Sequence, residues 1–134
     1  MRDKVRYLTI DELVAINQII ITNYSHGEMT GVKSLELLDS AVNRPKQSAF
    51  GEDAYKTIFD KAAAFFESLA QNHAFHSANK RVAFSAMVQF MRYNKYKFVM
   101  DPKKAETFTI NVVEHKYSLC EISVIIRKYS HSND

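Results

Sequence analysis

The sequence predicts an all-α protein, built as one bundle of about six helices with a small flap before the third helix. Its 134 residues include only 3 Gly and 2 Pro, too little turn chemistry for a sandwich or barrel, which needs a turn signal about every 8 to 12 residues. Hydrophobic residues make up 46% and charged residues 25% of the chain, close to globular averages. A chain of this length fits one domain, so we expect residues 1–134 to form a single domain.

Capping residues and stop signals place the expected helices along the chain. Thr9 and Ser118 are each followed, three positions later, by a glutamate, which is the order of a capping box. Ser34 is a further N-cap candidate, and Asp101 precedes a proline suited to the first helical position. The second helix should stop near Pro45. We therefore expect helices over residues 10 to about 23, 35 to about 45, 57–72, 79 to about 92, 102 to about 114 and 119–129.

Apolar positions indicate which helix faces are buried. In the second helix, Leu35, Leu38 and Val42 form one stripe. The fourth helix carries two neighbouring apolar rows and is charged only near its ends, so we expect it to be the central helix, wrapped by the others. Its two rows are Val82, Ala86 and Phe90, and Ala83, Met87 and Met91.

Three segments lack helical periodicity. Residues 44–55 are expected to form an extended loop or a small hairpin, which is the predicted flap. Residues 98–100 are expected to be a short strand or an extended connection, and residues 130–134 a frayed tail.

Composition narrows the classes of function. The chain has 18 basic and 15 acidic residues, a net charge of only +3, and its densest cationic cluster is more typical of solvated helix ends than of a polyanion site. Direct nucleic-acid binding is therefore the least favoured function. The longest apolar run, residues 62–66, is too short to span a bilayer, so no membrane association is expected. The cationic cluster consists of Arg92, Lys95, Lys97, Lys103 and Lys104.

Cysteine usage and the start of the chain favour a cytoplasmic protein. Cys120 is the only cysteine, which excludes an intrachain disulfide and a zinc site of several thiolates. Its apolar neighbours predict an inert, packed thiol. Residues 1–6 are followed by no apolar stretch of the length that a signal peptide needs.

The segment from His73 to Arg81, with the sequence HAFHSANKR, carries the candidate chemistry. It enters the fourth helix, and a helix N-terminus presents free backbone N–H groups and a partial positive charge. Asn79 is expected to cap this helix. Lys80 and Arg81 are unfavourable in a first turn unless an anion compensates them, and a phosphate group would do so. Histidine is the usual general base near neutral pH, so His73 could accept a proton from an attacking hydroxyl, which points to phosphoryl or nucleotidyl transfer.

Spacing alone leaves a structural alternative open. In that alternative His73 caps the third helix, Phe75 fills the core, and Lys80 and Arg81 face solvent. His73 and His76 have the spacing of a metal pair, but two histidines without a nearby carboxylate are weak evidence for a metal site.

The motif resembles the signature of the Fic/Doc family, H-x-F-x-[DEN]-[GA]-N-[GK]-R, at six of its seven specified positions. The stretches LLDSA and RP around residues 37–45, FG at 50–51 and the alanine-rich helix before the motif are also similar to the family. Lys80, where the Fic branch has glycine, and Phe84, where that branch has a second arginine, both resemble the death-on-curing (Doc) branch.

The resemblance implies a Fic-type fold and a transferase. Fic relatives transfer AMP to a target hydroxyl, whereas Doc toxins transfer the γ-phosphate of ATP to a threonine of elongation factor Tu, which arrests translation. A Phd-type antitoxin partner is implied as well. By the resemblance His73 would be the general base and Phe75 would anchor the loop in the core. The phosphates would be held by Ala78, Asn79, Lys80 and Arg81, and the flap, with Lys46, Gln47 and Ser48, would bind the target segment.

One residue departs from the family pattern. Ser77 stands where the family has an acidic residue or asparagine, and the acidic form helps to hold Mg²⁺. A hydroxyl is a weaker ligand for that cation, so we expect Ser77 to lower the affinity for Mg²⁺ unless another carboxylate or the nucleotide supplies the charge. A Doc-type kinase is the leading hypothesis, and an AMP transferase or a catalytically degenerate binding protein are the alternatives.

Overall fold

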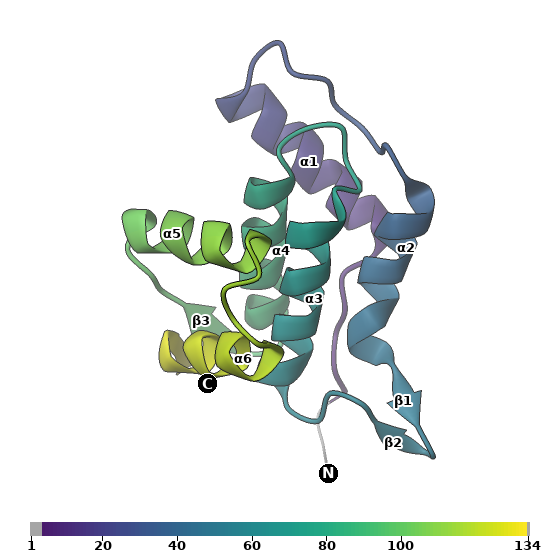
Figure 1. Cartoon of the computed structure of the whole chain (residues 1–134), viewed down its shortest axis with the longest axis vertical. Helices are drawn as coiled ribbons and strands as arrows, with labels where there is room; N and C mark the ends of the chain where they lie inside the picture. The colour runs from purple at the N-terminus through teal and green to yellow at the C-terminus, as the bar shows by residue number, and fades with distance from the viewer. Residues whose placement is uncertain (1–3, 134) are drawn as a thin grey trace.

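The computed structural model describes residues 4–133 and confirms the predicted helical fold (Figure 1). Two short antiparallel pairs of strands lie outside the helices, β1 with β2 and β3 with β4. The described elements are α1 (Ile10–Tyr24), α2 (Leu35–Asn43), the 3-10 helix η1 (Arg44–Lys46), β1 (Ser48–Ala49), β2 (Glu52–Asp53), α3 (Ile58–Asn72), α4 (Asn79–Tyr93), β3 (Tyr96–Phe98), α5 (Pro102–Val113), α6 (Leu119–Lys128) and β4 (Ser130–Ser132).

The caps predicted at Thr9, Ser34, Asp101 and Ser118 form, which explains why these helix starts agree with expectation. The Thr9 hydroxyl accepts the Glu12 N–H at 3.2 Å, and the Glu12 carboxylate accepts the Thr9 N–H at 3.0 Å. The capping box at Ser118 has the same two bonds. The Asp101 carboxylate accepts N–H groups of the first turn of α5. These contacts involve neighbours in the chain, so the sequence alone determines them.

The centre of the bundle is a pair of helices, α3 and α4, and this corrects the expectation that α4 alone is central. The helix α3 contacts α2, α4, α5 and α6, and α4 contacts α1, α3, α5 and β3 (Figure 1). Residues 61–66 of α3 are all buried. Because this stretch has almost no polar side, neighbours must cover α3 all round. Among residues 4–133, no helix has the length and apolarity that crossing a membrane requires.

Two predicted burials are wrong. Leu35 is 62% exposed, while Leu38, Ala41 and Val42 form the buried face of α2. A helical side chain leans toward the N-terminus of its helix, so the first residue of α2 leans beyond the helix start. Cys120 is exposed as well, because it lies on the outer face of α6.

The expected frayed tail is also wrong for residues 130–132. These residues form β4, which pairs with β3 in a register that places Phe98 opposite Ser130 and Tyr96 opposite Ser132. The predicted strand at 98–100 is therefore shifted to 96–98. The pairing joins segments far apart in the chain, which no local pattern predicts. Asp134 lies outside the described residues.

The predicted flap is a short helical turn followed by a hairpin. Residues 44–46 form η1, and β1 and β2 are joined through Phe50 and Gly51, whose φ angles of 54° and 78° are both positive. The Phe50 side chain is fully exposed at the tip. Figure 1 shows this hairpin near the start of α3, at the end of the bundle away from the α3–α4 loop.

Candidate functional site

The motif segment is a tight loop between two left-handed residues. His73 ends α3 with φ 52° and ψ 50°, and Ala78 precedes α4 with φ 65° and ψ 25°. A left-handed residue other than glycine costs about 1–2 kcal/mol. The loop therefore needs other contacts to hold its shape, and it has three sets of them.

Asn79 makes the first set, in a role that differs from the predicted helix cap. Its Oδ1 accepts the Phe75 N–H at 3.0 Å, and its Nδ2 donates to the Phe75 carbonyl at 3.0 Å. The side chain thus closes the loop by binding both backbone groups of one residue. The position before the helix belongs to Ala78, which has no side-chain cap, so the first N–H groups of α4 stay available to an external acceptor.

The second set pairs the loop with the segment that leads into α2. Val32 and Phe75 form an isolated antiparallel bridge. The Ala74 carbonyl accepts N–H groups of Lys33 at 2.8 Å and Ser34 at 3.0 Å. The His76 N–H donates to the Gly31 carbonyl at 3.2 Å. Phe75 itself is 2% exposed and packs in the hydrophobic core.

Asn17 makes the third set, and sequence reasoning missed it. It lies in the buried face of α1, with no exposed area. Its Oδ1 accepts the Gly31 N–H at 3.0 Å, and its Nδ2 donates to the Ser77 carbonyl at 3.0 Å. The available signal was an asparagine four residues from both Leu13 and Ile21, within an otherwise apolar stripe. A polar residue in such a stripe needs a partner.

The polar side chains of the motif face outward from this rigid loop. His73, His76, Lys80 and Arg81 are all exposed. The Arg81 guanidinium lies 5.1 Å from the centre of the Tyr24 ring. Within residues 4–133, neither Lys80 nor Arg81 forms an ion pair, and the first turn of α4 has no acidic residue. The arrangement is an uncompensated cationic helix start beside a histidine, which suits a phosphate group.

The residues at the site do not fit a protein-held Mg²⁺. Magnesium is normally bound through one or two carboxylates plus phosphates and waters. Ser77 offers a neutral hydroxyl, and its carbonyl already accepts from Asn17. Within residues 4–133, no three His, Cys, Asp or Glu side chains gather closely enough to hold a metal ion.

The structure does not bring the predicted target-binding residues to the motif. Lys46, Gln47 and Ser48 lie near the start of α3, whereas His73 follows its end, and a helix of 15 residues is about 22 Å long. Figure 1 shows the two loops at opposite ends of α3. The segment that borders the motif is Gly31–Ser34 instead.

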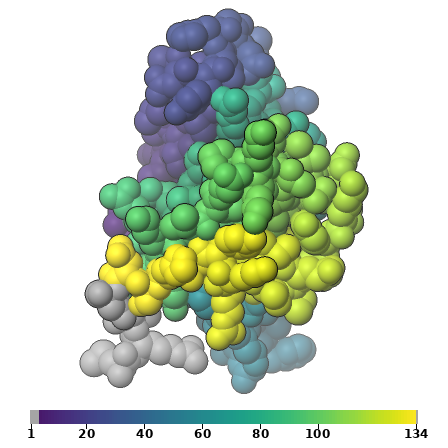
Figure 2. Space-filling view, turned by 90° about the vertical axis from the view of Figure 1, so that its left-hand side faces the viewer, coloured from purple at the N-terminus to yellow at the C-terminus, as the bar shows by residue number. Residues whose placement is uncertain are grey.

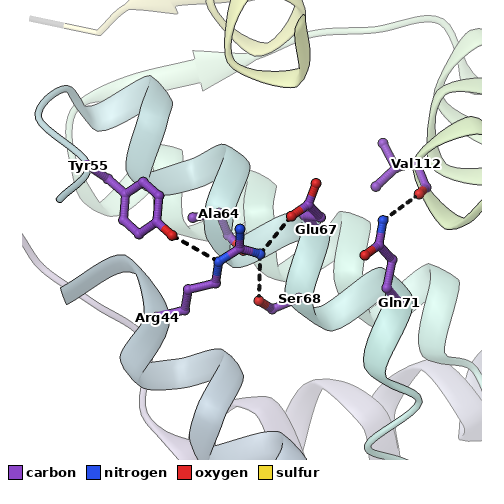
Figure 3. A network of polar contacts seen from close by, with 7 residues as sticks. All are labelled: Arg44, Tyr55, Ala64, Glu67, Ser68, Gln71 and Val112. Carbon is purple, nitrogen blue, oxygen red and sulfur yellow. Dashed lines mark hydrogen bonds and ion pairs between the residues drawn. The ribbon is translucent and has the colours of Figure 1, made fainter. Parts of the chain in front are cut away.

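Two side chains tie the hairpin to α3. The Lys61 ammonium, near the start of the helix, pairs with Asp53 of β2 at 3.1 Å, and Arg44 contacts residues 64–68 farther along it (Figure 3). The Arg44 guanidinium donates to the Tyr55 hydroxyl at 3.1 Å and the Ser68 hydroxyl at 3.0 Å, and pairs with Glu67 at 2.8 Å. Burial acts to lower the pKa of Arg44, but the bonds to Tyr55 and Glu67 outweigh it and raise the pKa. A permanently charged clamp thus ties both ends of the hairpin segment to α3.

The family comparison agrees with this site. The model of the Fic/DOC family matches residues 7–91, which include α1, α3, the motif loop and most of α4. The match also covers α2 and the hairpin, so the shared part of the chain includes the motif loop and every segment that contacts its backbone. The chain belongs to the Fic/DOC family.

Two relatives place the chain within that family. It is 44% identical over 70 residues to Toxin Doc of Mycolicibacterium smegmatis, a match that covers 52% of this chain and 54% of that protein. It is 23% identical over 123 residues to Protein kinase doc of Escherichia phage P1, which covers 92% of this chain and 94% of that protein. The chain thus spans about half the length of the first relative and most of the second. Both relatives carry the name Doc, which confirms the predicted branch.

Proposed function

We propose that this chain is a Doc-type toxin that transfers the γ-phosphate of ATP to a threonine of elongation factor Tu and so arrests translation. The observation that carries the proposal is the rigid motif loop, which presents His73 beside the uncompensated cationic start of α4. The names of the relatives, a toxin and a protein kinase, support the same reaction class. The proposal places the protein in the cytoplasm, under control of a Phd-type antitoxin, with no direct nucleic-acid partner.

In the proposed reaction the chain binds phosphates and moves one proton. The free N–H groups of α4, together with Lys80 and Arg81, hold the phosphates of ATP. Ala78 contributes only a methyl group, which allows close approach to the helix start. His73 accepts the proton of the threonine hydroxyl as its oxygen bonds to the γ-phosphorus and the bond to the β-phosphate oxygen breaks, which releases ADP. Asn79 holds the loop rather than the nucleotide.

The decisive experiment uses purified chain and purified elongation factor Tu with ATP labelled on either the γ- or the α-phosphate. Label from the γ-position on the factor is the expected result. Label from the α-position would instead establish AMP transfer. Transfer of neither label would indicate a catalytically degenerate binding protein. Ser77, in place of the family's acidic residue or asparagine, would then account for the lost activity.

Arg81→Ala should weaken ATP binding. A charge-assisted contact contributes about 1.5–3 kcal/mol, which corresponds to a roughly ten- to hundredfold rise in Kd by calorimetry. Arg92→Ala is the matched control, because Arg92 is exposed at the other end of the same helix. Equal affinities of the two variants would remove Arg81 from the nucleotide site.

Ser77→Asp should increase the dependence of transfer on Mg²⁺. The substitution adds the carboxylate that the site lacks, and a carboxylate is a strong ligand for a hard cation. The rate is measured across a Mg²⁺ titration, with Ser77→Asn as a neutral control at the same position. A flat response in the aspartate variant would show that the metal is not held from this position.

The target segment is proposed to lie along the edge formed by residues 29–34, instead of the hairpin. Val32 in this segment already pairs with Phe75 of the motif loop, and Met29 at its start is 62% exposed. Met29→Asp should therefore lower transfer to the factor while ATP binding is unchanged. Phe50→Asp is the matched control, because Phe50 is also an exposed apolar side chain but lies on the distant hairpin. The reverse outcome would return the target site to the hairpin.

A further inference from the structure

A groove between α5 and the end of α6 has no part in the proposed transfer site. It has a volume of about 440 Å³, which is within the range of binding pockets. Its apolar lining includes Met100, Phe108 and Ile125, and three lysines stand among the lining residues. Figure 2 shows this side of the molecule, where the green atoms of α5 adjoin the yellow atoms of the C-terminal segment.

The three lysines are uncompensated. Lys103, Lys104 and Lys128 line the groove, and no acidic side chain does. Within residues 4–133, none of the three forms an ion pair. Lys128 is favourable at a helix C-terminus, but Lys103 and Lys104 lie in the first turn of α5, where the helix dipole disfavours cations. Lysines that served only to face solvent would not need to surround apolar side chains, as these three do.

The aromatic rings favour a protein over a nucleic acid as the ligand. Single-stranded nucleic acid is bound by stacking bases on open ring faces. Phe108 is only 4% exposed and packs against Phe66 and Tyr117, and Tyr129 packs against Phe98 with the Lys128 ammonium 5.6 Å from its ring centre. Phe108 is buried, and Tyr117 and Tyr129 are half-buried against ring neighbours, so the groove offers an apolar hollow for a side chain, with cations around it, and no open stacking face.

We propose that this groove is a docking site for an acidic segment of a partner protein. An aliphatic or aromatic side chain of that segment enters the hollow over Met100 and Ile125, and its Asp or Glu side chains pair with Lys103, Lys104 and Lys128. Charge complementarity selects the ligand, because a basic or neutral segment leaves three ammonium groups without an anionic partner. The site is separate from the motif loop, so this proposal does not depend on the proposed kinase activity.

The test is a selection of random peptides displayed on phage against the full chain, followed by anisotropy titration of the enriched peptides. The enriched peptides should combine Asp or Glu with Leu, Ile or Phe. The variant K103E/K104E/K128E should weaken their binding about tenfold or more. Thr107→Trp, at an exposed position of the groove wall, should block the hollow without changing its charge. Lys97→Glu, an exposed lysine on β3 outside the groove, should leave binding unchanged.

Three results would overturn the proposal. One is a selection that enriches no acidic peptides. The second is binding of acidic peptides that survives both groove variants, which would place their site elsewhere. The third is binding of oligouridine RNA that the lysine variant abolishes and Thr107→Trp leaves intact. The lysines would then bind a polyanion without use of the apolar hollow. Circular dichroism of each variant verifies that it is folded.

Discussion

Replacing His73 by Ala should abolish transfer of the γ-phosphate to the target while ATP still binds. A general base contributes about 10²- to 10⁴-fold to a rate, and His73 is the proposed base. Its side chain is exposed and, within residues 4–133, forms no hydrogen bond that supports the loop, whose shape rests on Asn17, Asn79 and the backbone pairing. The loss should therefore appear in the rate and not in nucleotide affinity, with transfer followed by label and binding by calorimetry.

Two further variants separate chemistry from backbone conformation. His73→Asn keeps a residue that tolerates the left-handed backbone of this position and removes the imidazole, so it should be as inactive as His73→Ala. His76→Ala removes the other exposed histidine of the same loop and should retain transfer. An inactive His76→Ala beside an active His73→Ala would move the base to His76.

The parts of the fold that depend on neighbours in the chain could be predicted from the sequence. The capping boxes at Thr9 and Ser118 fixed the starts of α1 and α6, and Asp101 with Pro102 fixed the start of α5. The motif could be predicted as well, because nine adjacent residues contain it. Within it, the expected burial of Phe75 is confirmed.

Contacts between distant segments could not be predicted. The strand β4 depends on β3, more than thirty residues earlier. The family resemblance assigned target binding to the hairpin, a role that requires a place near the motif, yet α3 separates the two by its whole length. The role of Asn79 was misjudged for a related reason. A residue at a helix start can cap that helix or fold back on the preceding loop, and only the loop conformation decides between the two.

Asn17→Leu should lower the free energy of unfolding and remove most transfer activity, even where the variant is fully folded. The substitution keeps the branched shape and the number of heavy atoms of the side chain but leaves the Gly31 N–H and the Ser77 carbonyl without partners in a buried place. Each of the two unsatisfied groups costs about 1–3 kcal/mol, so a loss of roughly 2–6 kcal/mol is expected in urea unfolding. The same two bonds join α1 and the segment before α2 to the motif loop, so the position of the loop should relax.

A loss of activity through simple instability must be distinguished from a displaced loop. Ile126→Ala, a fully buried change in α6, should cost about 2–5 kcal/mol as well, without touching the motif. Asn23→Ala, an exposed asparagine on α1, should change neither property. Both variants are compared at a temperature where both are folded. If Asn17 positions the loop, Asn17→Leu loses transfer and its His76 amide exchanges faster with solvent. Ile126→Ala then keeps the transfer rate and the His76 exchange rate near the wild-type values. Equal transfer by Asn17→Leu and Ile126→Ala would reduce Asn17 to a stabilising residue, because the motif loop would then keep its working shape without the link to α1.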